Sequence, residues 1–142
     1  IGQLARLRVY VELTAAAGVL TAIVFGGMVL YSFGFAAFLF KTLPAEDAGS
    51  ILRKAFPVFY VWCIAVALIA AVPLWFVDPL SAWLTITVAL TTVPLRQLLM
   101  PAINSASDNK NRRRFNLLHG LSVLAALAQM AVLGYVLARI AT

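Results

Sequence analysis

The stretch "AFPVFYVWCIAVALIAAVPLWFV", residues 55–77, contains no Asp, Glu, Lys or Arg. It is long enough for a helix to cross the hydrocarbon core of a bilayer, which takes roughly 20 residues. Three more stretches lack charged residues in the same way, over residues 13–40, 79–95 and 115–138. None of them shows the alternating polarity that is typical of a membrane β-barrel strand. The sequence therefore predicts four transmembrane helices.

The composition supports this class of protein. Of the 142 residues, 63% are hydrophobic and 11% are charged, whereas about a quarter of the residues in a soluble domain are charged. We expect an all-α integral membrane bundle that forms one domain over residues 1–142, with spans at about 11–40, 57–77, 80–100 and 115–138. The first span exceeds what a bilayer needs, so it either tilts or projects beyond the lipid. Its length, and the lack of a small-residue cleavage site after it, argue against a signal peptide. The first residue is Ile1 rather than Met, which leaves room for residues ahead of it.

Basic residues set the expected orientation in the membrane. Four spans place both termini and the turn near Asp78 on one side, and the other two loops on the opposite side. The loop side has most of the basic residues: Lys41, Arg53, Lys54, Arg96, Lys110, Arg112, Arg113 and Arg114. The side of the termini has Arg6, Arg8 and Arg139. Because cytoplasmic loops carry an excess of Lys and Arg, we expect both loops in the cytoplasm and both termini outside.

The loop between the first two spans has a pattern of its own. Glu46 and Asp47 follow Pro44, and the basic pair at positions 53–54 comes shortly before Pro57. Acidic residues at the start of a helix and basic residues at its end suit the helix dipole. This pattern predicts a short amphipathic interfacial helix that ends at Pro57. A plain ordered connector is the alternative.

A second basic cluster lies next to the fourth span. Lys110, Arg112, Arg113 and Arg114 are expected to lie against anionic lipid headgroups, and Arg96 is expected to extend toward the same surface. Runs of basic residues also occur in nucleic-acid-binding proteins. Here the neighbouring span explains the cluster, so we expect the lipid bilayer, and no nucleic acid, as the partner.

The fourth span carries polar residues on one face. Phe115, His119, Ser122, Ala126 and Gln129 recur at spacings of four and three residues, which places them on one side of a helix. Polar groups are costly in lipid unless they face protein or water. We therefore predict that His119, Ser122 and Gln129 face into the bundle and make polar contacts there, with His119 hydrogen-bonded across helices.

Two further patterns concern helix packing. Gly18, Ala22 and Gly26 form a row of small residues in the first span, which lets another helix approach closely. Pro94 lies within the third span and predicts a kink there, because proline cannot donate the backbone hydrogen bond of a helix. A kinked packing helix is the simpler interpretation of Pro94, and a gating hinge is the alternative.

Cys63, Met100 and His119 lie at similar depths in three different spans. A thiol, a thioether and an imidazole together would suit a soft ion such as Cu(I). The alternative is ordinary packing, since buried Cys and Met behave as hydrophobic residues. A haem with two histidine ligands is disfavoured because the chain has one His. The sequence requires no cofactor, and copper and haem are the candidate cofactors.

The segments "FGGMVLYSFGFAAFLFKTLPAEDAGSILRKAFPVFY" (25–60) and "RRFNLLHGLS" (113–122) resemble the transmembrane protein 205-like family of small four-helix membrane proteins. One departure concerns the fourth span, where Ala125 and Ala126 stand at the place in which the family tends to have an asparagine. The resemblance implies a four-helix membrane fold and no particular reaction. An animal member is associated with resistance to a platinum drug, which is consistent with soft-metal handling.

Three functional classes follow from these observations. The favoured one is a non-enzymatic accessory or assembly subunit of a larger membrane complex, with other membrane subunits or further copies of this chain as partners. The first alternative is a small-molecule or soft-metal handling protein with its site at the cytoplasmic end of the bundle. The second alternative is a haem- or quinone-binding oxidoreductase subunit. Enzymatic activity is disfavoured because no nucleophile–base pair, paired carboxylates or phosphate-binding loop is evident.

Overall fold

The computed structural model describes residues 2–142 and is helical along almost all of them. The elements, in chain order, are α1 (Gly2–Val29), η1 (Leu30–Phe35), α2 (Ala36–Thr42), α3 (Ala45–Val77), α4 (Pro79–Pro94), η2 (Leu95–Leu99), α5 (Met100–Asp108) and α6 (Arg112–Ala141). The segments η1 and η2 are π-helical turns that join α1 to α2 and α4 to α5 without a break. Four continuous helices therefore result, each long and apolar enough to cross a membrane. The predicted all-α membrane bundle is confirmed.

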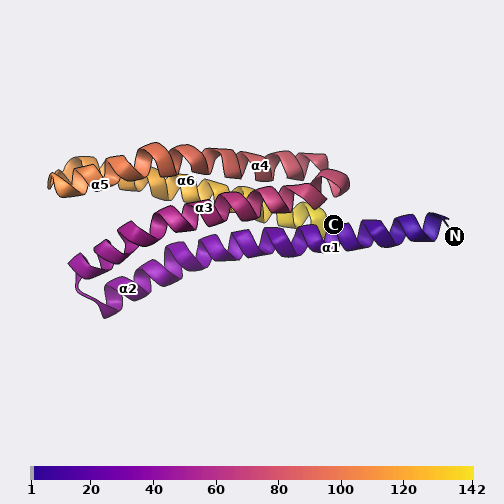
Figure 1. Cartoon of the computed structure of the whole chain (residues 1–142), viewed down its shortest axis with the longest axis horizontal. Coiled ribbons are helices and arrows are strands. Elements are labelled where there is room, and N and C mark those ends of the chain that lie inside the picture. Colours follow the sequence, from indigo (N-terminus) through magenta and orange to yellow (C-terminus); the bar gives the residue numbers. More distant parts are fainter. Residues whose placement is uncertain (1) are drawn as a thin grey trace.

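The helices lie along one common direction, and the bundle opens at one end. In Figure 1, α1–α2 and α3 separate from α5 and α6 toward the end that carries the α2–α3 and α5–α6 connections. At the other end, α1 projects beyond the remaining helices, and residues 2–12 are exposed. This projection lies almost entirely before the expected first span at 11–40, so the choice between tilt and projection beyond the lipid stays a prediction.

The core joins all four helices. Its main cluster contains Val24, Met28, Cys63, Ala67, Val88, Ala89, Met130 and Leu133. Many of these side chains are small, which lets the helix backbones approach closely, as is usual in membrane bundles where van der Waals packing replaces the hydrophobic effect. The remaining apolar surface is exposed, as expected for a chain that faces lipid.

The predicted interfacial helix does not exist as a separate element. Residues 45–56 are helical, with Glu46 and Asp47 in the first turn, but α3 continues through Pro57 to Val77. Proline has a backbone φ that suits a helix and removes only one hydrogen bond of the ladder. Packing outweighs that loss, because Ala48 and Leu52 form a buried cluster with Leu39 of α2. The segment is therefore the first part of the second span.

The row of small residues in α1 does not pack against the rest of the bundle as a unit. Ala22 and Gly26 are exposed, and a Cβ atom built on Gly26 would meet nothing within 4 Å. The close approach occurs one residue later, where a Cβ atom on Gly27 would lie 2.6 Å from Cζ3 of Trp62. Since Val24 and Met28 are the buried residues here, the inward face of α1 lies beside the predicted row.

Candidate functional site

A cavity of about 220 Å³ lies where the bundle opens. Its wall comes from the end of α1, η1 and α2 in the first span, from α3 up to Cys63, from the α4–η2 junction and from α6. The apolar part of the wall is rich in aromatic side chains: Phe33, Phe40, Phe56, Phe59 and Tyr60. The polar and sulfur-containing part consists of Met28, Ser32, Cys63, Thr92, His119, Ser122, Gln129 and Met130.

Both π-helical segments border this cavity. Ser32 and Phe33 of η1 line it on one side, and Leu95 of η2 lines it on another. The segment η2 follows Pro94 directly, because a residue without a backbone N–H interrupts the α-helical ladder. Pro94 was predicted to kink the third span, and what the structure shows at this position is a change from α-helical to π-helical register. Single π turns are frequent at functional sites, where they re-aim side chains.

Gln129 is the most buried polar side chain of the cavity wall on α6, with 6% of its surface exposed. Its Nε2 donates hydrogen bonds to Oγ1 of Thr91 at 2.9 Å and to Oγ1 of Thr92 at 3.1 Å. A longer contact of 3.4 Å joins Nε2 to the carbonyl oxygen of Val88. The amide of Gln129 therefore connects α6 to α4 inside the bundle.

The threonines fix the orientation of this amide. The Thr91 hydroxyl donates to the carbonyl oxygen of Thr87, and the Thr92 hydroxyl donates to that of Val88. Each hydroxyl has only one hydrogen to donate, so both threonine oxygens can only accept from Gln129. The NH₂ group must then face α4, and Oε1 points away from it.

His119 and Ser122 differ from the prediction. Both line the cavity, but the His119 side chain is exposed and stacks on Phe115 of its own helix, with ring centroids 5.6 Å apart. The Ser122 hydroxyl donates to the backbone carbonyl oxygen of His119 at 2.7 Å. Within residues 2–142, neither side chain hydrogen-bonds to another helix. The reason is the opening of the bundle, which leaves this part of α6 without a close neighbour on the cavity side.

The three predicted soft-metal ligands are not brought together. Cys63 and His119 both line the cavity, whereas Met100 lies outside its wall at the start of α5. Met28 and Met130 contribute thioethers to the wall instead, and the prediction had overlooked both. In the described part of the chain, no group of three His, Cys, Asp or Glu residues is placed to hold a metal ion.

Arg96, which was expected to extend toward the headgroups, makes a contact within the bundle. Its side chain is half-buried, and its Nε donates to the carbonyl oxygen of Pro57 at 3.2 Å. The guanidinium thus joins η2 to α3 beside the cavity.

The basic cluster lies at the α5–α6 turn, where all four of its residues are exposed: Lys110, Arg112, Arg113 and Arg114. There, Oδ1 of Asn111 accepts from the backbone N–H of Arg114 and caps α6.

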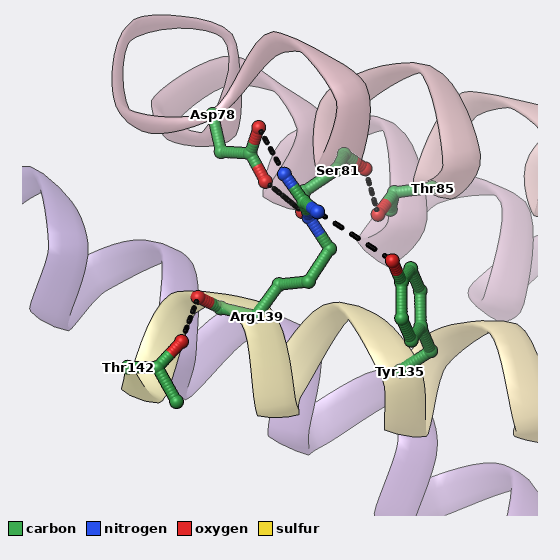
Figure 2. Close-up of polar contacts among 6 residues, drawn as sticks. All are labelled: Asp78, Ser81, Thr85, Tyr135, Arg139 and Thr142. Atoms are coloured by element: carbon green, nitrogen blue, oxygen red, sulfur yellow. Dashed lines mark hydrogen bonds and ion pairs between the residues drawn. The ribbon is translucent and has the colours of Figure 1, made fainter.

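Ion pairs join helices at both ends of the bundle, and no local sequence pattern predicts them. At the open end, an Arg53 nitrogen lies 2.8 Å from Oδ1 of Asp108 and joins α3 to α5. At the closed end, Arg139 binds both carboxylate oxygens of Asp78, at 2.8 and 3.2 Å, as Figure 2 shows. The Ser81 hydroxyl donates to the same carboxylate at 2.6 Å. The hydrogen bond from Arg139, helped by that from Ser81, lowers the pKa of Asp78 to about 2.

The comparisons with known proteins place the chain in a family without assigning an activity. The family model described as a domain of unknown function, DUF4149, matches residues 19–112. This range contains Cys63 and most of the cavity wall, but it ends before His119, Ser122 and Gln129. No curated protein and no solved structure matches the chain. Since the match covers well over half of the sequence, the protein belongs to the DUF4149 family.

Proposed function

We propose that this protein is a non-enzymatic membrane protein that holds a small lipid-soluble molecule in the cavity between its first span, α3 and α6. The observation that carries the proposal is the cavity itself, with its volume of about 220 Å³. Binding sites for small molecules are concave and mostly apolar, with a few placed polar groups. This cavity has that composition, since most of its lining side chains are apolar, several of them aromatic, and Gln129 supplies a polar group held in place by α4.

The position of the cavity favours a ligand that dissolves in the bilayer. Its lining residues belong to the four helices that are long and apolar enough to cross a membrane. Phe33 and Leu127 line the cavity and are 53% and 44% exposed, which supports a wall that borders the region that lipid would occupy. A ligand can therefore reach the site from the membrane.

Photolabelling tests this proposal. The protein in lipid vesicles would be illuminated with a small phenyl diazirine, and the labelled residues would be identified by peptide mass spectrometry. Ala126 lines the cavity, so Ala126→Leu should reduce labelling of the lining residues severalfold. Ala128 is exposed on the same helix, so Ala128→Leu is the matched control and should leave that labelling unchanged. Equal labelling in the two variants would contradict the proposal.

An accessory or assembly subunit is the second candidate function, and the surface of α1 supports it. Ala22 and Gly26 are exposed, and nothing lies within 4 Å of a Cβ atom built on Gly26. Small residues on a lipid-facing surface allow a further helix to pack closely. Native mass spectrometry in mild detergent should then show partner chains or further copies in a fixed ratio, and Gly26→Ile should remove them. A monomer without partners in both samples would argue against this candidate.

A soft metal ion such as Cu(I) is an alternative occupant of the cavity. Met28 and Met130 line it together with Cys63 and His119, and soft ions prefer thiolate, thioether and imidazole ligands. Elemental analysis of the purified protein tests this alternative directly. Copper that is retained by the unaltered chain and lost in Cys63→Ala would favour the metal over an organic ligand.

The orientation in the membrane and the lipid contacts are also proposals. The basic residues around the α5–α6 turn support a cytoplasmic position for both loops, where Lys110, Arg112, Arg113 and Arg114 would contact anionic headgroups. Labelling of intact cells with a membrane-impermeant maleimide tests the sidedness. The variants are Ser107→Cys and Thr142→Cys, each made in a Cys63→Ala background. Labelling at position 142 and protection at position 107 are expected, and the reverse would invert the topology.

The relationship to the transmembrane protein 205-like family likewise remains a proposal. It is supported by the patterns at residues 25–60 and 113–122, of which the first lies within the matched family range. The structure of a member of that family would test it. A cavity between the first span, the second span and the fourth span is the expected result.

A further inference from the structure

Gln129 has one amide atom that the protein leaves unused. Its Nε2 is bonded to Thr91 and Thr92, but no donor among residues 2–142 reaches its Oε1. Within residues 2–142, the Tyr31 hydroxyl is the one buried side-chain polar atom that has no hydrogen-bond partner and no exposed surface of its own. Oε1 of Gln129 also has no partner, so it must have some exposed surface and is not sealed. It lies on the side of the amide away from α4, and Gln129 lines the cavity.

The arrangement makes this position a hydrogen-bond acceptor that cannot become a donor. Turning the amide over would place Oε1 against two threonine oxygens, whose hydrogens are already donated to the carbonyl oxygens of Thr87 and Val88. An unpaired polar atom costs more free energy in a medium of low dielectric constant than in water. A ligand that donates to Oε1 would remove this cost, whereas a ligand that offers only acceptors would leave it in place.

We propose that the ligand of this cavity is an apolar molecule with a hydroxyl group, and that this hydroxyl donates to Oε1 of Gln129. The inference rests on the proposed binding of a lipid-soluble molecule and adds its chemical class. Quinols, alkylphenols and long-chain alcohols share this chemistry, whereas quinones, ethers and esters have only acceptors at the corresponding position. A site with a fixed hydrogen-bonding group discriminates strongly against analogues that cannot pair with it.

Two matched probes test the proposal in the unaltered protein. One is a twelve-carbon alcohol with a diazirine on its chain, and the other is the methyl ether of the same molecule. Each would be incorporated into vesicles that contain the protein. The readout is the labelling of cavity-lining residues, such as Met130, divided by that of Leu124, which is exposed to lipid on the same helix. This ratio corrects for different partitioning of the probes into the bilayer.

The expected ratio is about fivefold higher for the alcohol than for the ether, which corresponds to one neutral hydrogen bond. Gln129→Leu should lower the ratio of the alcohol to that of the ether and leave the ether unaffected. Since Gln129→Leu also removes contacts to α4, its helicity and unfolding would be compared with those of the unaltered chain. The comparison of the two probes in the unaltered chain needs no variant and stands whether or not Gln129→Leu folds.

The outcomes separate this inference from the proposed function. Equal cavity labelling by the alcohol and the ether, lost for both in Ala126→Leu, would overturn the hydroxyl donor and retain binding in the cavity. Cavity labelling by neither probe would overturn both. A phenol probe with the same chain distinguishes the sources of the donor, because stronger labelling by the phenol would indicate an aromatic headgroup against Phe56, Phe59 and Tyr60.

Discussion

The contact between Gly27 of α1 and Trp62 of α3 offers the sharpest test of the packing. A Cβ atom on Gly27 would overlap Cη2 of Trp62 and lie 2.6 Å from Cζ3, so the indole must move by more than about 0.8 Å before both atoms reach the 3.4 Å of ordinary van der Waals contact. The indole is held in turn. It stacks on Phe59 with ring centroids 6.0 Å apart, and Phe59 stacks on Tyr31 at 3.9 Å. Gly27→Ala should therefore disturb the whole aromatic stack.

The neighbouring Gly26 supplies a matched control for the magnitude. Alanine stabilises a helix by about 0.5–1 kcal/mol relative to glycine, and this gain applies to both positions. Overpacking costs about 1–3 kcal/mol and applies only to Gly27, because Gly26 has nothing within 4 Å of its Cβ position. The free energy of unfolding of Gly27→Ala should thus be about 1–3 kcal/mol lower than that of Gly26→Ala.

Reversible unfolding in mixed micelles of increasing SDS content, followed by far-ultraviolet circular dichroism, measures this difference. Gly27→Ala combined with Trp62→Leu should recover most of the loss, because the shorter side chain leaves room for the new methyl group. The usual effect of a neutral surface change is within about 0.5 kcal/mol. If the free energies of unfolding of Gly26→Ala and Gly27→Ala differ by no more than this, the close contact between Gly27 and Trp62 is contradicted.

Three more predictions use the same assay. The pKa of Asp78 is lowered to about 2, so its pairing with Arg139 stabilises the fold above pH 4. This contribution is lost as the pH falls toward 2, and Asp78→Asn should remove this pH dependence. Because the pair is partly open to solvent, we expect it to contribute about 1 kcal/mol at most. An acid-induced loss of stability that is larger in Asp78→Asn than in the unaltered chain would contradict this assignment. Arg96→Leu removes the hydrogen bond to α3 and should lower the free energy of unfolding by about 1–2 kcal/mol, whereas an unchanged free energy would show that this hydrogen bond does not stabilise the fold. Leu133 is fully buried and Leu124 is 65% exposed. Leu133→Ala should therefore lower the free energy of unfolding by about 2–5 kcal/mol, and Leu124→Ala by much less. Equal losses would contradict the face of α6 that the structure turns toward the core.

The amino-acid sequence by itself determined that this chain spans a membrane as four helices. Charge-free stretches long enough for a bilayer are a local property, and residues 55–77 needed no neighbour to be recognised as a span. The placement of acidic residues at the start of α3 was equally local. The prediction that a helix ends at Pro57 was wrong, because the packing of Leu52 against α2 outweighs the tendency of proline to break a helix.

Only the tertiary structure decided how these helices face one another. Periodicity placed His119 and Gln129 on one face of α6, yet Gln129 is held by α4 and His119 stacks on its own helix at the opening of the bundle. Contacts between residues far apart in the chain, such as that of Arg139 with Asp78, have no local pattern. The cavity is the clearest case, since it exists because α1–α2 and α6 separate at one end. That separation depends on crossing angles and on the register of the π-helical turns, and these are properties of the packed bundle rather than of any one segment.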